Sequence, residues 1–104
     1  MGQFSVHANK SPASKLFPYL LDVQHDLFDQ LATRVVIPLQ ARQTVKGKPL
    51  TLLTPVVTIA GQEFILLTPQ LAGVAKQQLG PWVADLSAHR QAIITALDLL
   101  VTGV

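Results

Sequence analysis

The sequence predicts a mainly β fold that ends in one α-helix, and three stretches of the chain carry this prediction. Residues 3–8 alternate polar and apolar side chains with the period of two that is typical of a half-buried strand. Val56–Ile59 and residues 63–67 are apolar runs around residues 60–62, where Gly61 is free to adopt the positive φ of a hairpin turn. Residues 88–101 contain neither proline nor glycine, which favours a helix.

Two further strands are predicted at residues 19–24 and 34–39. Pro38 lies in the second and cannot donate a ladder hydrogen bond, so we expect it at an edge, a bulge or a bend. Residues 25–34 between them are expected to form a loop or one short helical turn. Residues 71–80 fit either a short helix that runs into a strand or a strand alone, and the sequence does not separate the two.

The predicted helix has a start signal, an apolar stripe and a stop signal. Ser87 is a favourable N-cap residue, and Gly103 lies where a helix C-terminus prefers glycine. Five apolar residues recur at helical spacing and should pack on the sheet: Ile93, Ala96, Leu97, Leu100 and Val101.

The composition predicts one domain, residues 1–104, that buries part of its surface against a partner. Of its residues, 49% are hydrophobic and only 13% are charged, whereas about 25% are charged in an average protein. So little polar surface favours burial against another chain, and a homodimer is the simplest arrangement. Trp82, which follows Gly80 and Pro81, is expected in the core or at an interface.

Several classes of protein are excluded by what the sequence lacks. It contains no cysteine, which excludes disulfides and thiolate metal sites. No apolar run reaches the roughly 18 residues of a membrane-spanning helix, and residues 1–10 lack the basic and long apolar regions of a signal peptide. We therefore expect a cytoplasmic protein that makes no membrane contact.

Positive charge is concentrated in the middle of the chain. The net charge is only +2, which gives little support to nucleic-acid binding. No acidic residue occurs between Asp29 and Glu63, and that stretch holds Arg34, Arg42, Lys46 and Lys48. Such a stretch is either a docking surface for an acidic segment or a solvated loop that carries a few lysines.

The titratable side chains give little support to an enzyme. A ribonuclease-like set of Asp22, His25, Asp26 and Arg34 can be drawn. Adjacent residues such as His25 and Asp26 point to different sides of a strand or helix, however, and make a poor acid–base pair. His89 falls in the first turn of the predicted helix, where the helix dipole disfavours a cation. No histidine pair has zinc spacing and no glycine-rich phosphate loop is present, so we expect no metal, no cofactor and a domain that works by binding.

Seven short segments, spread over nearly the whole chain, are recognisable when they are taken together. They are QF at residues 3–4, DVQHDLFD at 22–29, TRVVIPL at 33–39, PVVTI at 55–59, LTPQLAGV at 67–74, VADLSAHR at 83–90 and TGV at 102–104. In this order and with these gaps, the chain resembles the CcdB toxins of bacterial toxin–antitoxin modules.

This resemblance implies a fold and a mode of action. CcdB toxins are not enzymes; they form a strongly curved antiparallel sheet related to SH3-like barrels and to MazF, with a small second sheet and a C-terminal helix. They assemble as two-fold dimers. The dimer binds the A subunit of DNA gyrase and traps the enzyme with cleaved DNA. A CcdA-type antitoxin neutralises the toxin with a disordered arm. The two together repress their own operon and serve plasmid maintenance, and the antitoxin supplies the DNA contact.

The resemblance also implies which residues contact gyrase. The family's principal contact maps onto Thr102, Gly103 and Val104, and Thr102 replaces a tryptophan that stacks on a gyrase arginine. Further contacts map onto Asp98 and Val101 of the helix.

A second gyrase contact maps onto Leu27 and Phe28, which lie between Asp26 and Asp29. Exposed apolar residues in polar surroundings often mark a docking site, although one of the two could instead fill the space under the sheet. For the acidic arm of an antitoxin, the candidates are Arg42, Lys46 and Lys48.

Two alternatives remain open. The first alternative is an endoribonuclease that uses His25 or Arg34, because MazF toxins share the expected fold. The other is a detoxified relative that binds antitoxin but does not poison gyrase, because the family's tryptophan is absent at Thr102.

Overall fold

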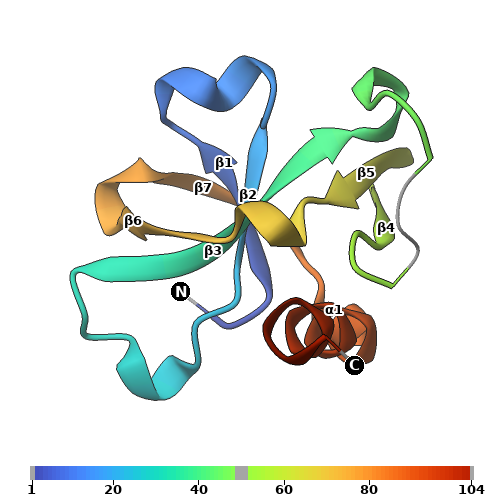
Figure 1. Cartoon of the computed structure of the whole chain (residues 1–104). Coiled ribbons are helices and arrows are strands. Elements are labelled where there is room, and N and C mark those ends of the chain that lie inside the picture. Colours follow the sequence, from blue (N-terminus) through green and yellow to red (C-terminus); the bar gives the residue numbers. More distant parts are fainter. Residues whose placement is uncertain (1, 49–51, 104) are drawn as a thin grey trace.

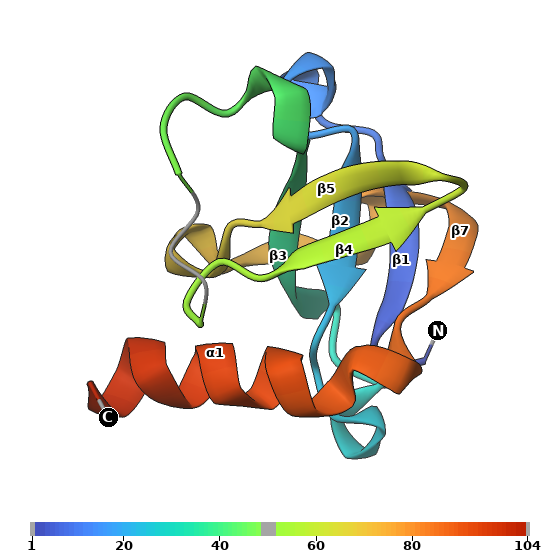
Figure 2. The same cartoon turned by 90° about the vertical axis from the view of Figure 1, so that its right-hand side faces the viewer.

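The computed structural model describes residues 2–48 and 52–103. In it, seven antiparallel strands form one curled sheet, and an α-helix lies against this sheet (Figures 1 and 2). The elements are β1 (Ser5–Asn9), β2 (Tyr19–Asp22), β3 (Thr33–Ala41), β4 (Val56–Ile59), β5 (Gln62–Leu66), β6 (Ala72–Ala75), β7 (Leu79–Asp85) and α1 (Arg90–Thr102). The order of strands is β4-β5-β3-β2-β1-β7, and β6 also pairs with β3. The predicted mainly β fold with a C-terminal helix is confirmed. The small second sheet that the resemblance implies is not separate, because all seven strands of the described residues belong to one sheet.

Both faces of the sheet are covered, because consecutive residues of its central strands enter different apolar clusters. Leu21 of β2 and Ile37 of β3 belong to the main core, which also receives Ile93 of α1. Their chain neighbours Leu20 and Val36 belong to a smaller cluster on the other face. The central strands are therefore apolar without a break, as expected for strands buried on both sides.

Strand β1 is buried on both faces, which corrects the prediction of a half-buried strand. Phe4 and Val6 enter the main core as expected. Ser5 and His7 on the other face are buried as well, and β1 pairs with β2 on one edge and with β7 on the other. The His7 ring Nδ1 lies 3.0 Å from the Gly80 carbonyl oxygen of β7, in hydrogen-bond contact.

Pro38 lies at the point where β3 changes its partner. On one side β3 pairs with β6 through residues 33–36 and with β5 through residues 39–41. The Pro38 carbonyl points to this side, where it accepts a hydrogen bond of 3.0 Å from the Leu67 N–H. The proline nitrogen, which has no proton to donate, therefore faces the gap between two partner strands, and no ladder bond is lost.

The predicted hairpin of β4 and β5 is confirmed, with a loop one residue shorter than expected. Ile59 pairs with Gln62, which leaves Ala60 and Gly61 as a two-residue loop. Both have positive φ, 52° and 81°, as a type I′ turn requires. Glycine adopts this conformation freely, whereas Ala60 is strained by its Cβ.

The two segments that the sequence left open are now defined. Residues 25–34 contain one 3₁₀ turn, Asp26–Phe28, in agreement with the expected loop or short turn. Residues 71–80 match neither expectation, because they form strand β6, a 3₁₀ turn at Lys76–Gln78 and the start of β7. Trp82 of β7 is 61% exposed, so its expected place in the core is wrong, and its place at an interface stays a prediction.

The helix starts later than predicted. Ser87 does not cap α1; residues Ser87–His89 form a 3₁₀ turn, and α1 begins at Arg90. The Ser87 hydroxyl instead donates a 2.6 Å hydrogen bond to the carboxylate of Asp85, the last residue of β7. The predicted stop is confirmed: Gly103 has a φ of 75°, and its N–H donates to the Leu99 carbonyl at 2.9 Å.

Only the first half of the apolar stripe packs on the sheet. Ile93 and Ala96 are buried and Leu97 packs against the core. Leu100 is 38% exposed and Val101 is 80% exposed, so the expectation is wrong for these two. Figure 2 shows the reason, since the last turns of α1 extend beyond the strands that cover the rest of the helix.

A buried arginine joins β3 to β2. Arg34 has no solvent-exposed side-chain surface, and its Nε and Nη2 donate to Asp22 Oδ2 at 3.0 and 2.6 Å. The Asp22 carboxylate is equally buried, and its Oδ1 accepts the Gln24 N–H. The third guanidinium nitrogen, Nη1, donates to Asp29 Oδ1 at 2.7 Å. Arg34 therefore belongs to the interior and not to the basic surface that charge counting predicted.

Replacing Ala60 by asparagine should stabilise the protein by about 1 kcal/mol, because asparagine tolerates the positive φ that strains alanine. The free energy of unfolding in urea measures this. Ala60→Val is the matched control and should lower it, since a β-branched side chain is least compatible with this conformation. An Ala60→Asn protein no more stable than the original would contradict the strained turn.

Asp22→Asn should lower the free energy of unfolding by about 3 to 5 kcal/mol, because it leaves a fully buried guanidinium without its buried counter-charge. Asp29→Asn should lower it by no more than about 1 kcal/mol, because the Asp29 side chain is 46% exposed and water replaces the lost charge. Equal losses in the two variants, measured by urea unfolding, would show that Asp22 is not the main partner of Arg34.

Candidate functional site

The end of α1 presents one exposed face. Asp98, Val101 and Thr102 are three and four residues apart, so they lie on the same side of the helix, and all three are exposed. The Thr102 hydroxyl donates a 2.6 Å hydrogen bond to the Asp98 carbonyl, which holds the threonine against its own helix. Gly103 follows in the left-handed conformation and is also exposed, and Val104 lies outside the described residues.

A second exposed apolar surface lies on the 3₁₀ turn Asp26–Phe28. Leu27 is 76% and Phe28 is 51% exposed, so the interpretation that one of them fills the space under the sheet is wrong. Leu31, three residues beyond Phe28, is 53% exposed and extends this surface. Sequence reasoning missed Leu31 as a candidate contact residue. Its apolar side chain in the same polar segment was the signal that could have identified it.

The two apolar surfaces are apart within one chain. Figure 1 shows the turn Asp26–Phe28 at the lower left, whereas α1 lies at the lower right, under β4 and β5. The structure therefore groups the predicted gyrase-contact residues into two separate patches, one on the helix end and one on the turn.

The turn is held by polar contacts that the sequence did not reveal. Asp29 bonds Arg34, and the Asp29 carbonyl accepts a 2.5 Å hydrogen bond from Lys76 Nζ. The Gln24 side chain donates to the Phe28 carbonyl at 2.8 Å. One signal was available: an arginine inside an apolar strand, with acidic residues shortly before it, indicates a buried ion pair.

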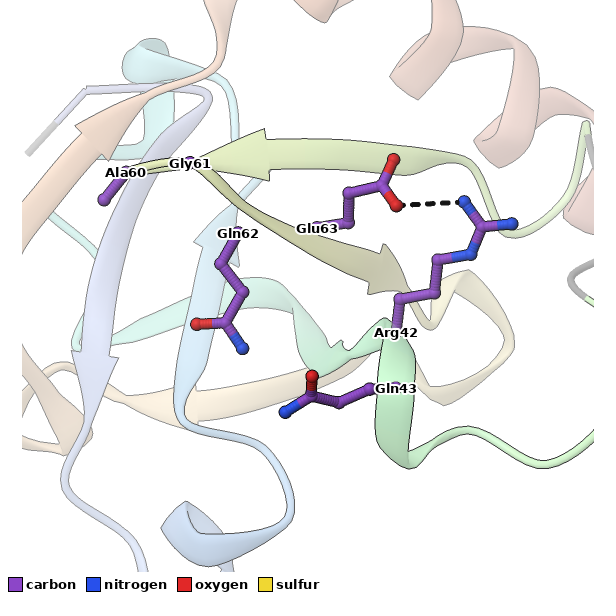
Figure 3. A pocket seen from close by; sticks show the side chains of 6 residues that line it. All are labelled: Arg42, Gln43, Ala60, Gly61, Gln62 and Glu63. Atoms are coloured by element: carbon purple, nitrogen blue, oxygen red, sulfur yellow. Dashed lines mark hydrogen bonds and ion pairs between the residues drawn. The ribbon is translucent and has the colours of Figure 1, made fainter.

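The predicted basic surface is reduced to three residues, of which one is paired. Arg42 Nη1 lies 3.1 Å from Glu63 Oε1, and both side chains are about half exposed. Figure 3 shows this ion pair at an open pocket lined by residues 42–43 and by the tip of the hairpin, residues 60–63. Lys46 and Lys48 are exposed further along the same loop. This surface carries positive charge but is partly neutralised by Glu63.

The ribonuclease-like set is not assembled. Arg34 is enclosed by its two carboxylates and has no exposed surface with which to contact a substrate. The His25 Nδ1 accepts the Leu27 N–H at 3.0 Å and so caps the turn. The Asp26 Oδ1 accepts the Gln3 N–H at 2.8 Å and so links the turn to the start of the chain. Within residues 2–48 and 52–103, no three histidine or acidic side chains are grouped so that they could hold a metal ion.

None of the helices among the described residues has the length and apolar character needed to cross a membrane.

Comparison with known proteins relates the chain to toxins. A solved structure described as an endoribonuclease in complex with its cognate antitoxin, from a mycobacterial species, superposes with a TM-score of 0.76. The match covers 97% of this chain and 94% of the other at 13% sequence identity, so it shows a shared fold, the MazF-like one expected from the sequence. The family model described as CcdB protein matches residues 3–103. Since that match spans nearly the whole chain, the protein belongs to the CcdB family of toxins from toxin–antitoxin modules.

Proposed function

We propose that the protein is a DNA gyrase poison, which binds the A subunit of gyrase as a homodimer and traps the complex of gyrase with cleaved DNA. The observation that carries this proposal is the end of α1. Its apolar stripe continues past the sheet, so Val101 is 80% exposed where a purely structural helix would end or turn polar. Exposed apolar side chains of this kind mark a docking surface.

Gly103 defines how the tip of this surface is shaped. Its left-handed conformation ends the helix and turns the chain away from the helix axis. Val101 and Thr102 precede this turn directly, so they form a short, fixed projection. In a two-fold dimer, the projections of both protomers would be presented to one target.

An antitoxin of the CcdA type is proposed as the second partner. The matched endoribonuclease is described as bound to its cognate antitoxin. Arg42, Lys46 and Lys48 would receive an acidic segment of that antitoxin, since opposite charges favour association. Any contact with DNA, as in autoregulation of an operon, would come through the antitoxin, because a net charge of +2 gives the toxin little attraction of its own.

An endoribonuclease is the second candidate, since the shared fold favours it. The burial of Arg34 between two carboxylates opposes it, because this cation is not available to a phosphodiester. A detoxified, antitoxin-binding relative is the third candidate. The three differ in what the purified protein does to gyrase, to RNA and to an antitoxin peptide.

The test is expression in two otherwise identical hosts, one with sensitive gyrase and one with a gyrase A subunit resistant to CcdB. Killing of the first host alone supports the proposal, and purified protein should then yield linear, cleaved plasmid in the presence of gyrase. Killing of both hosts together with cleavage of naked RNA would replace it by the endoribonuclease. Growth of both, with tight binding of a CcdA-type peptide, would indicate the detoxified relative.

Deleting residues 102–104 provides the matched variant for this experiment. Thr102 and Gly103 are exposed, so the truncated protein should fold and bind antitoxin almost normally but fail to poison gyrase. Leu16→Ala is the control, because Leu16 is 50% exposed on a loop remote from α1 and should leave killing unchanged. A truncated protein that still kills would show that the helix tip is only structural.

Thr102→Trp should strengthen gyrase binding by about 10- to 1000-fold, measured as the dissociation constant of the A subunit. A tryptophan at this position would stack on the family's gyrase arginine, and a desolvated contact of that kind contributes about 1 to 2 kcal/mol in each protomer. The threonine hydroxyl that is replaced donates to the Asp98 carbonyl within its own helix turn. Unchanged affinity would mean that this chain meets gyrase without the family's stacking contact.

A further inference from the structure

The turn that carries Leu27 and Phe28 is built from polar anchors, although its largest side chains are apolar. Leu27 and Phe28 are 76% and 51% exposed and thus contribute little burial to the fold. An exposed turn of this kind would ordinarily be mobile, because few apolar contacts hold it. Here it is held by hydrogen bonds from four separate parts of the chain, at residues 3, 24, 34 and 76.

The strongest fastening is the ion pair of Asp29 with Arg34. Asp29 directly follows the 3₁₀ turn, and its N–H closes that turn by donating to the Asp26 carbonyl at 3.1 Å. Its Oδ1 accepts from Arg34 Nη1 at 2.7 Å, the length of a charge-assisted hydrogen bond. Arg34 is itself immobile, since its other two donors are fixed to buried Asp22. The end of the turn is therefore tied to a rigid point in the sheet.

Asp29 is not needed to neutralise Arg34. The guanidinium carries one positive charge, and Asp22, which is buried with it, already supplies one negative charge. Asp29 is a second carboxylate and is 46% exposed. What it adds is a link between the interior and the turn, so its removal affects the turn more than the core.

Two more anchors act on the same short stretch. Lys76, which follows β6, donates to the Asp29 carbonyl at 2.5 Å. Gln24 bridges the turn to β3, because its amide nitrogen donates to the Phe28 carbonyl and its oxygen accepts the Val35 N–H. The backbone that follows Phe28 is thereby held, while the side chains of Leu27 and Phe28 remain exposed to a partner.

We propose that Asp29 is a positioning residue, whose ion pair with Arg34 keeps Leu27 and Phe28 in the conformation that docks on gyrase. The inference rests on the proposed function. Its physical basis is preorganisation, since a partner that binds an ordered turn avoids the entropic cost of ordering it. Asp29 itself need not touch gyrase for this effect.

The test compares the full-length protein with Asp29→Ala, which removes the anchor but retains the Asp22–Arg34 pair. Hydrogen exchange of the free protein should show the amides of Leu27, Phe28 and Leu31 exchanging about tenfold faster, while amides of β3 and β5 are unchanged. Affinity for the gyrase A subunit should fall about tenfold, equivalent to ~1.4 kcal/mol. Asp29→Glu, which retains the carboxylate, should recover part of both losses.

The matched control is Asp85→Asn, which removes one exposed carboxylate that bonds Ser87 in a different turn. It should change neither the exchange of residues 27–31 nor gyrase affinity. Unchanged exchange in Asp29→Ala, or faster exchange with unchanged affinity, would overturn the inference while leaving the proposed function intact. If the unmodified protein itself does not bind the A subunit, the proposed function fails, and the inference fails with it.

Discussion

The structure depends on one buried arginine. Arg34 occupies the interior of β3, where an isolated charge would be prohibitive, and it is tolerated because buried Asp22 on the adjacent strand accepts two of its hydrogen bonds. The same guanidinium reaches Asp29 beyond the end of the sheet. A single side chain thus fixes β2 against β3 and sets the position of a turn that has little apolar burial of its own. Stability and the presentation of an exposed surface are joined through this residue.

Strand β3, which carries Arg34, connects this ion pair to the rest of the sheet. It pairs with β2 along one side, and on the other side with β6 and then with β5. One strand can serve three partners because Pro38 lies at the change from β6 to β5, where a missing N–H removes no ladder bond. The strands consequently diverge on either side of this point and the sheet curls, which Figure 1 shows as strands fanning out from a common centre. The hairpin of β4 and β5 is thereby placed over α1.

Local signals in the sequence were sufficient for the elements that depend on neighbouring residues. Gly61 and Gly103 were recognised because a positive φ is a property of one residue in its own turn. The burial of a side chain was harder to predict, because it depends on residues that are distant in the sequence. Arg34 was grouped with surface cations by its charge, and the alternation in β1 did not indicate that both faces of this strand would be buried. Serine is a residue type that favours the N-cap, but the Ser87 hydroxyl bonds to the carboxylate of nearby Asp85 instead of capping α1.

The same distinction applies to the candidate site. Leu27, Phe28 and the tip of α1 became candidates without the structure through the resemblance to CcdB toxins. For Leu27 and Phe28 there was a second reason, because apolar residues in polar surroundings are visible in a sequence. The contacts that support the turn were not identified, because Asp29, Gln24 and Lys76 come from segments that only the fold brings together. The two patches therefore differ in kind. The helix tip is shaped by its own glycine and depends on local sequence alone, whereas the turn is shaped by the interior of the sheet. Substitutions of the buried pair Asp22 and Arg34 should thus alter the second patch and spare the first.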